Sequence, residues 1–442
     1  MERKLNHKPY SRIFRPSIVL LGAIGPFLSY VAWYLTSSAI FAPYSTLTLA
    51  VTWIALGYLL LSLSKDTFLC MVRRDVAGVF GWSLVLAMIS LIVVQANAVP
   101  LAAWDALGGE WGVHSYAEQA VRIIDPVFGG ETPRAPRHPP LVPYILMVGV
   151  TLSDLTDSVV SAGALGALLS LGIPVSFICA LGLRFHRVSL SPFLCLTFLT
   201  VPLLENHVTV FGYPEVFVWA LTQILFLTMF LRLTPGFERS FPMLLQTLLV
   251  TGLLLFTKSP AVIFAFSAWT AYVLSATSVR MLMKFALVFL VVGGCSALLL
   301  EEHGLRYLLP IISEDAGAIY ASFSGRLSQV NTSNFLPSLK AIALASFING
   351  SFSVLPLAAL VVIVGCLANP KPLSRSVKFL SILLVLMVLA FIFAGLIDYV
   401  ANNSGWGRDT LLSRSMLPFL AVCPALLLLA LISLQKNALY IR

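Results

Sequence analysis

The chain has 442 residues, of which 59% are hydrophobic and 11% are charged, and its formal net charge is +9. Soluble domains carry roughly 25% charged residues, so a soluble fold of this composition would have too little polar surface to cover its core. The composition therefore predicts an all-α, polytopic membrane protein in contact with membrane lipids. Basic cytoplasmic loops account for the net charge, so no nucleic-acid partner is expected.

Apolar runs recur along the whole chain, each with the length of about 17 to 25 residues that crosses a bilayer as a helix. They predict about twelve transmembrane helices in a single domain that covers residues 1–442. The predicted spans are 17–36, 44–64, 76–98, 158–183, 189–204, 215–231, 240–257, 260–279, 285–300, 341–368, 379–397 and 415–434.

The distribution of charge between the loops predicts the orientation, because cationic loops are translocated poorly. With the N-terminus in the cytoplasm, the cytoplasmic side holds 19 Lys and Arg residues and 4 Asp and Glu residues. The other side holds 9 Lys and Arg residues and 15 Asp and Glu residues. This asymmetry predicts that both termini are cytoplasmic and that the acidic face is the outer one. We expect a bacterial inner membrane, in which the outer face and the active site are periplasmic.

One apolar segment, 139–153, is only about 15 residues long and contains three prolines near its start. If it crossed the membrane, every later loop would change sides, and Arg184 and Arg187 would lie outside. We therefore expect an interfacial or re-entrant helix on the outer face, with an ordinary short span as the alternative. The outer face then carries two large loops, 99–157 and 301–340.

The first outer loop begins with a candidate catalytic carboxylate. Asp105 follows Trp104 a few residues after the span 76–98, so it lies at the membrane surface, where fewer waters compete for a base or a metal ligand. Trp104 is also explained as a member of the interfacial aromatic belt. Further along, His138 directly precedes a proline pair that fixes the backbone, although a single imidazole is weak support for a site.

A second candidate acid lies at the outer mouth of a later span. Glu215 ends the sequence Gly-Tyr-Pro-Glu, which contains Tyr213, and it directly precedes the apolar run 216–231. A carboxylate at the N-terminal end of a helix is stabilised by the helix dipole. Simple capping of the helix explains the residue equally well.

Three cations on the acidic outer face are candidate binding groups for a phosphate. Lys258 lies between two apolar spans and opposes the positive-inside trend, which favours an anionic partner at the headgroup level, although snorkelling also explains it. Arg408 and Arg414 precede the last span. The planar guanidinium of arginine suits a pair of phosphate oxygens.

In their order along the chain these motifs resemble those of the membrane-embedded GT-C glycosyltransferases, in particular the protein O-mannosyltransferase and lipid A aminoarabinose transferase type. They are an acid just after an early helix, Pro-Pro-Leu before an interfacial helix, Gly-Tyr-Pro-acid at a helix start, Thr-Lys-Ser-Pro, and Arg-Ser-Met-Leu-Pro before the last span. The resemblance runs from Ala98 to Ala430. Each motif is short, and the resemblance rests on their order along the chain and on their shared membrane face.

The resemblance implies that a hexose or pentose passes from a polyprenyl phosphate carrier to a lipid, glycan or protein acceptor, with inversion at the sugar carbon. It implies that Asp105 is the base for the acceptor or a metal ligand, and that Glu215 is the second acid. Lys258 and Arg414 match phosphate-binding positions, and His138 stands where many relatives have Lys or Glu. Asp105 stands alone where some members have an acidic pair, and Glu replaces the commoner Asp at 215, so a divalent metal (Mg or Mn) held by these two acids stays open.

Trp104, Tyr213 and Arg408 complete the set of candidate substrate-binding residues. These residue types also suit sugar transfer on chemical grounds alone, since a phosphate leaving group needs cations and an acceptor hydroxyl needs a carboxylate within reach.

A multi-span transporter, or a flippase for lipid or polysaccharide, is the main alternative. Transporters usually carry ionisable groups near the midplane and interrupted helices in repeated halves, and neither pattern is visible in the sequence. A membrane scaffold, the third alternative, would not need Lys258 and Arg414 on the acidic face.

Overall fold

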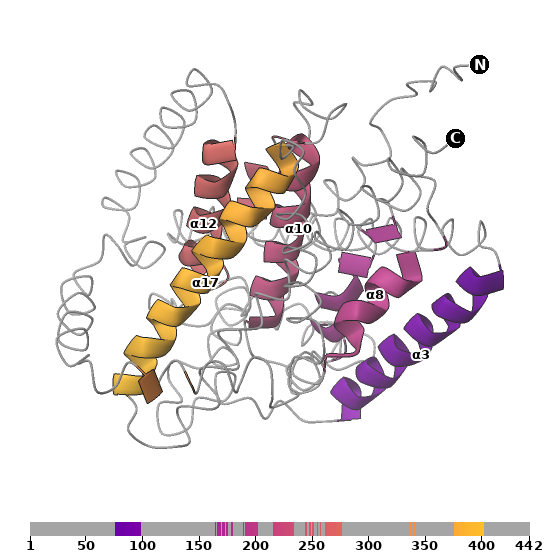
Figure 1. Cartoon of the computed structure of the whole chain (residues 1–442). Helices are drawn as coiled ribbons and strands as arrows, with labels where there is room; N and C mark the ends of the chain where they lie inside the picture. The colour runs from indigo at the N-terminus through magenta and orange to yellow at the C-terminus, as the bar shows by residue number, and fades with distance from the viewer. Residues whose placement is uncertain are drawn as a thin grey trace, which may run out of the picture.

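The computed structural model describes five continuous helices (Figure 1). They are α3 (Val76–Ala98), α8 (Ser191–Leu199), α10 (Glu215–Leu233), α12 (Ala261–Ser275) and α17 (Arg375–Ala401). It also describes residues 200 and 201 and individual positions within 164–179, at 189, within 244–257 and within 336–340. In all of these described residues the regular structure is helical and no strand occurs, which confirms the all-α prediction for this part of the chain.

Each of the five helices lies where a span is predicted. The predicted span 76–98 coincides with α3, and 215–231 lies within α10 and begins at the same residue. Helices α8 and α12 lie within the predicted spans 189–204 and 260–279, and α17 encloses 379–397. Two helices, Gly78–Ala98 within α3 and Glu215–Leu233, are long and apolar enough to cross a membrane. The total of about twelve spans stays a prediction, because the remaining runs lie wholly or partly outside the described residues.

Proline marks the beginning of three of these helices. Pro192 is the second residue of α8, Pro214 directly precedes α10, and Pro260 directly precedes α12. A proline at a helix start loses no hydrogen bond, since the first amides of a helix have no partner within it. The interior of α10 contains neither Gly nor Pro, so nothing in its sequence interrupts the helix once it has begun.

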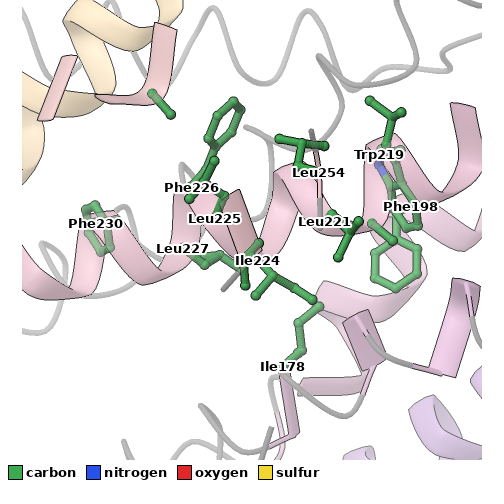
Figure 2. Close-up of a cluster of buried hydrophobic side chains, with 14 of the residues drawn as sticks. Ile178, Phe198, Trp219, Leu221, Ile224, Leu225, Phe226, Leu227, Phe230 and Leu254 are labelled. Atoms are coloured by element: carbon green, nitrogen blue, oxygen red, sulfur yellow. The ribbon is translucent and has the colours of Figure 1, made fainter. Parts of the chain in front are cut away.

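Helix α10 lies at the centre of the described packing. All 19 of its residues are buried, and it packs against both α12 and α17. Figure 2 shows the apolar cluster around it, in which Ile178, Phe198 and Leu254 approach α10 from other parts of the chain. A membrane-length helix that is covered by protein on every side has no face left for lipid.

Helix α3, in contrast, has one covered face and one open face, and both are apolar. Its buried side chains Trp82, Val85, Ile92 and Ala96 are separated by three, seven and four residues, which are the spacings of one helix face. On the other face Phe80 is 66% exposed and Leu91 is 62% exposed. Further large apolar side chains are exposed on α12 and α17: Ile263, Phe266, Leu274, Val385 and Leu389. Surfaces of this kind are unfavourable in water and are normal against lipid tails.

Several hydroxyl groups of the described residues bond to a backbone carbonyl of their own segment. In eight cases a Ser or Thr hydroxyl donates to the backbone carbonyl three or four residues earlier. The donors are Ser83, Ser170, Thr197, Thr200, Thr228, Thr251, Ser275 and Ser381. A local bond of this type lets a polar side chain occupy an apolar environment without a partner from another helix.

Helices α3 and α8 lie side by side (Figure 1), and a glycine of α3 lies in close contact with α8. A Cβ atom at Gly81 would lie 2.9 Å from both Cβ and Cγ of Pro192, so only glycine allows this approach. Gly81 is the sixth residue of α3 and Pro192 is the second residue of α8. At a rise of about 1.5 Å per residue, the N-terminal ends of the two helices therefore lie at nearly the same level.

Helices α10 and α12 are joined at their C-terminal ends. The Nε atom of Arg232, one residue from the end of α10, donates to Tyr272 Oη of α12 at 3.1 Å. The guanidinium carbon lies 5.8 Å from the centre of the Tyr272 ring. Because Tyr272 is three residues from the end of α12, the two helices run in the same direction. Trp269 Nε1 donates to Thr251 Oγ1 at 3.0 Å, so the chain between α10 and α12 packs against α12 as well.

Candidate functional site

Only one of the predicted site residues, Glu215, belongs to the described part of the chain. Asp105 and the candidate substrate-binding residues lie outside it: Trp104, His138, Tyr213, Lys258, Arg408 and Arg414. The predicted interfacial helix 139–153 lies outside it too, as do the first outer loop and most of the second. The expected approach of Asp105 to Glu215 across one cavity therefore stays a prediction.

Glu215 is the first residue of α10 and is only 8% exposed. The sequence predicted its position at the helix start, and this is confirmed. The amides of the first helical turn point toward this end of the helix, and the helix dipole favours a negative charge there. A residue that only caps a helix can lie at the surface and remain fully hydrated. Capping alone therefore does not explain why Glu215 is buried. A buried carboxylate at a helix N-terminus has the surroundings of a general base.

Below Glu215, a row of polar side chains continues along the same face of α10. Trp219, Thr222 and Gln223 follow Glu215 by four, seven and eight residues. At about 100° per residue, all four side chains fall within an arc of about 100°. Trp219, Thr222 and Gln223 are each fully buried, at 0% exposure. We call these three residues the polar face of α10.

The polar face is poorly supplied with hydrogen bonds. Among the residues that the structure describes, Trp219 Nε1, Thr222 Oγ1 and both amide atoms of Gln223 have no hydrogen-bond partner. Six residues after Thr222 on the same helix, Thr228 donates to the carbonyl of Ile224 at 2.6 Å. A buried polar atom without a partner costs about 1 to 3 kcal/mol, so these atoms distinguish the polar face from the rest of α10.

Helix α8 covers one edge of this face. The rings of Phe198 and Trp219 lie with centroids 5.1 Å apart and planes tilted by 55°, and Figure 2 shows the two rings next to each other beside α10. This aromatic contact holds the indole of Trp219 in place. The indole ring of Trp219 therefore packs against an apolar side chain, while its N–H group has no hydrogen-bond acceptor among the described residues.

The opposite end of α10 carries a buried cation. Arg232 is 6% exposed and bonds to Tyr272, as described above. It lies 17 residues from Glu215, or about 25 Å along the helix axis. Glu215 and Arg232 are therefore too far apart to act on the same small group, and Arg232 joins α10 to α12 at the far end.

Lys258 lies between two described positions, Thr257 and Ala261, both of which are buried. Because α10 and α12 run in the same direction, the beginning of α12 and the beginning of α10 lie toward the same side of the molecule. The segment that contains Lys258 directly precedes α12. The described helices thus place the start of α10, with Glu215, and the start of α12 on one side.

The polar face, Arg232 and Tyr272 are not among the site residues predicted from the sequence. Thr222, Gln223 and Thr228 interrupt the otherwise apolar run 216–231, and the first two share one helical face with Glu215, which was the available signal. Among the described residues, no three His, Cys, Asp or Glu side chains gather as a metal site would require. A metal held by Asp105 and Glu215 therefore stays a prediction.

Comparison with known proteins gives no relative to this chain: no family model, no curated protein and no solved structure matches it.

Proposed function

We propose that the protein is an integral-membrane glycosyltransferase that transfers a sugar from a polyprenyl phosphate carrier to a lipid, glycan or protein acceptor at the outer face of the membrane. The observation that carries the proposal is the burial of Glu215 at the first position of a membrane-length helix that protein surrounds on every side. A lipid-linked donor would bring its phosphate and sugar to this level of the bilayer. The ordered outer-face motifs of the sequence, which resemble those of GT-C enzymes, add to this support.

The proposed reaction needs a base, a nucleophile and a stabilised leaving group. A carboxylate, Asp105 or Glu215, accepts the proton of the acceptor hydroxyl, whose oxygen attacks the anomeric carbon of the sugar. The bond between that carbon and the phosphate oxygen breaks, and the polyprenyl phosphate leaves with the electron pair. Lys258 and Arg414 stabilise the charge that builds on this oxygen. Attack from the face opposite the leaving group inverts the sugar carbon.

The directions of the described helices support the proposed orientation. In that orientation α3 and α8 both run outward and α10 and α12 both run inward. The Gly81–Pro192 contact brings the beginnings of the first pair to one level, and the Arg232–Tyr272 bond does the same for the ends of the second pair. A crossing by 139–153 in addition to the predicted span 158–183 would make α3 and α8 antiparallel. The contact therefore favours a non-crossing 139–153.

A flippase or transporter is the second candidate, and one observation favours it. The polar face lies toward the middle of α10, since Gln223 is about 12 Å along the helix from Glu215. Polar groups at such a depth in a membrane-length helix are typical of a substrate pathway. The glycosyltransferase remains the first candidate because the polar face contains no ionisable side chain, whereas the buried carboxylate lies at the helix mouth.

A strain that lacks the gene separates the two candidates. Loss of a transferase removes one sugar from an envelope glycolipid, glycan or glycoprotein, and the unused polyprenyl phosphate sugar accumulates in the outer leaflet. There a membrane-impermeant lectin or oxidant reaches it, and mass spectrometry identifies both products. Loss of a flippase leaves the carrier in the inner leaflet, protected from the reagent, and that result would overturn the proposal.

A further inference from the structure

The polar face of α10 combines hydrogen-bond donors and acceptors without a charge. Trp219 offers one N–H donor, Gln223 offers two N–H donors and one carbonyl oxygen, and Thr222 offers a hydroxyl that can donate and accept. All three side chains are fully buried, and their free polar atoms have no partner among the described residues. The natural partner for such a set is a neutral group that also donates and accepts.

We propose that the polar face of α10 is a binding site for neutral hydroxyl groups, supplied either by ordered water or by the hydroxyls of a carbohydrate. A phosphate or a carboxylate would find no cation on this face, and a metal ion would find no carboxylate or imidazole in these three residues. A hydroxyl can accept from the indole or the amide and donate to the Gln223 oxygen. The site is independent of the reaction proposed above, because a transferase and a flippase would both have to accommodate a sugar.

The spacing along the helix fits a ligand larger than one atom. Trp219, Thr222 and Gln223 lie about 6, 10 and 12 Å from Glu215 along the axis of α10. The residues with unpartnered polar atoms thus extend over about 6 Å along the helix, similar to the size of a sugar ring or of two hydrogen-bonded waters. Phe198 holds the Trp219 ring at one edge of this interval.

Thr228 provides a matched control within the same helix. Thr222 and Thr228 are both threonines at 0% exposure, but the Thr228 hydroxyl already bonds to Ile224. Thr222→Val and Thr228→Val therefore remove the same atom from two buried sites of α10 and change its side-chain shape in the same way. Only the first change affects the proposed site.

Radiolytic hydroxyl-radical labelling of the full-length protein in lipid nanodiscs tests the proposal, because buried side chains are labelled only where bound water is activated beside them. We expect Trp219 to be labelled several-fold faster than Phe230, an aromatic residue 1% exposed on the same helix. The double variant Thr222→Val, Gln223→Met should reduce Trp219 labelling to the Phe230 level. The Thr228→Val control should leave it unchanged.

Added ligands distinguish the two possible sources of the hydroxyl group, ordered water and a carbohydrate. Farnesyl phosphate carrying mannose or arabinose should protect Trp219 if the site takes a carbohydrate, whereas farnesyl phosphate without a sugar should not. Labelling that neither sugar changes identifies water as the occupant, which also supports a neutral hydroxyl site. Trp219 labelling as slow as that of Phe230, with no response to either variant, shows a dry face and overturns the proposal. Thermal unfolding of each variant confirms that it is folded.

Discussion

The contact between Gly81 and Pro192 predicts that the substitution Gly81→Ala destabilises the protein when residue 192 is proline and stabilises it when residue 192 is glycine. In Gly81→Ala the new Cβ would lie 2.9 Å from two carbon atoms of Pro192, whereas carbon atoms in contact are normally about 3.5 to 4.0 Å apart. One helix must therefore shift by about 0.6 Å or more. Overpacking of this kind costs about 1 to 3 kcal/mol.

The same substitution also improves the helix, since Ala is favoured over Gly in a helix interior by about 1 kcal/mol. We therefore expect a net destabilisation of about 1 kcal/mol in the wild-type background. In a Pro192→Gly background the clash disappears, and Gly81→Ala should stabilise by about 1 kcal/mol. The coupling energy between the two sites is then about 2 kcal/mol.

Unfolding in mixed micelles with increasing denaturing detergent measures these free energies, and a double-mutant cycle isolates the coupling. Ser90→Ala, at an exposed position of α3, serves as the control and should change stability by less than about 0.5 kcal/mol. If Gly81→Ala has the same effect with and without Pro192, the close approach of α3 and α8 is refuted. The support that this contact gives to the orientation would then be lost.

Three further predictions concern the orientation and the outer-face residues. A cysteine introduced by His186→Cys should react with a membrane-impermeant thiol reagent only after the membrane is opened, because the positive-inside rule predicts that the loop with Arg184 and Arg187 is cytoplasmic; labelling from outside would invert the predicted topology from that point onward. Asp105→Asn should lower transfer on the order of 10²-fold or more while the protein stays folded and binds its donor, because the amide cannot accept a proton; an active variant would remove Asp105 as the base. Lys258→Ala should weaken donor binding through the lost contact to phosphate, measured by titration with a polyprenyl phosphate sugar, and unchanged affinity would show that Lys258 only snorkels.

The sequence predicted the helices well because apolar runs of membrane length carry a strong and simple signal. The boundaries of α3 and α10 agree with the predicted spans, and Glu215 lies at the helix start as expected. Pro214 explains part of this accuracy, since a proline before a helix defines where it begins.

The packing of the helices was beyond prediction from the sequence. Nothing in the run 216–231 indicates that α10 is buried on all sides while α3 keeps one face open, because both helices are predominantly apolar in sequence. The partner helices decide this difference. The Arg232–Tyr272 bond joins residues 40 positions apart, and the approach of Gly81 to Pro192 depends on how α3 and α8 pack.

The polar face could have been predicted from the sequence, but Thr and Gln residues in an apolar span are not by themselves a signal for a site. Single Thr and Gln residues in an apolar span usually satisfy themselves locally or face a neighbouring helix, as Thr228 does on α10. Only the structure distinguishes Thr222, whose hydroxyl has no partner among the described residues, from Thr228.

The fate of the bond between sugar and phosphate tests the central claim most directly. Purified full-length protein in liposomes would receive polyprenyl phosphate carrying an isotope-labelled mannose, glucose or arabinose, together with an acceptor extract from the same membrane. Mass spectrometry would then quantify free polyprenyl phosphate and the labelled acceptor. A glycosyltransferase releases the two in equal amounts, and Glu215→Gln should slow both on the order of 10²-fold if Glu215 takes part in proton transfer. Transfer of the donor between leaflets with the sugar–phosphate bond intact, equally fast in wild type and Glu215→Gln, would contradict the account.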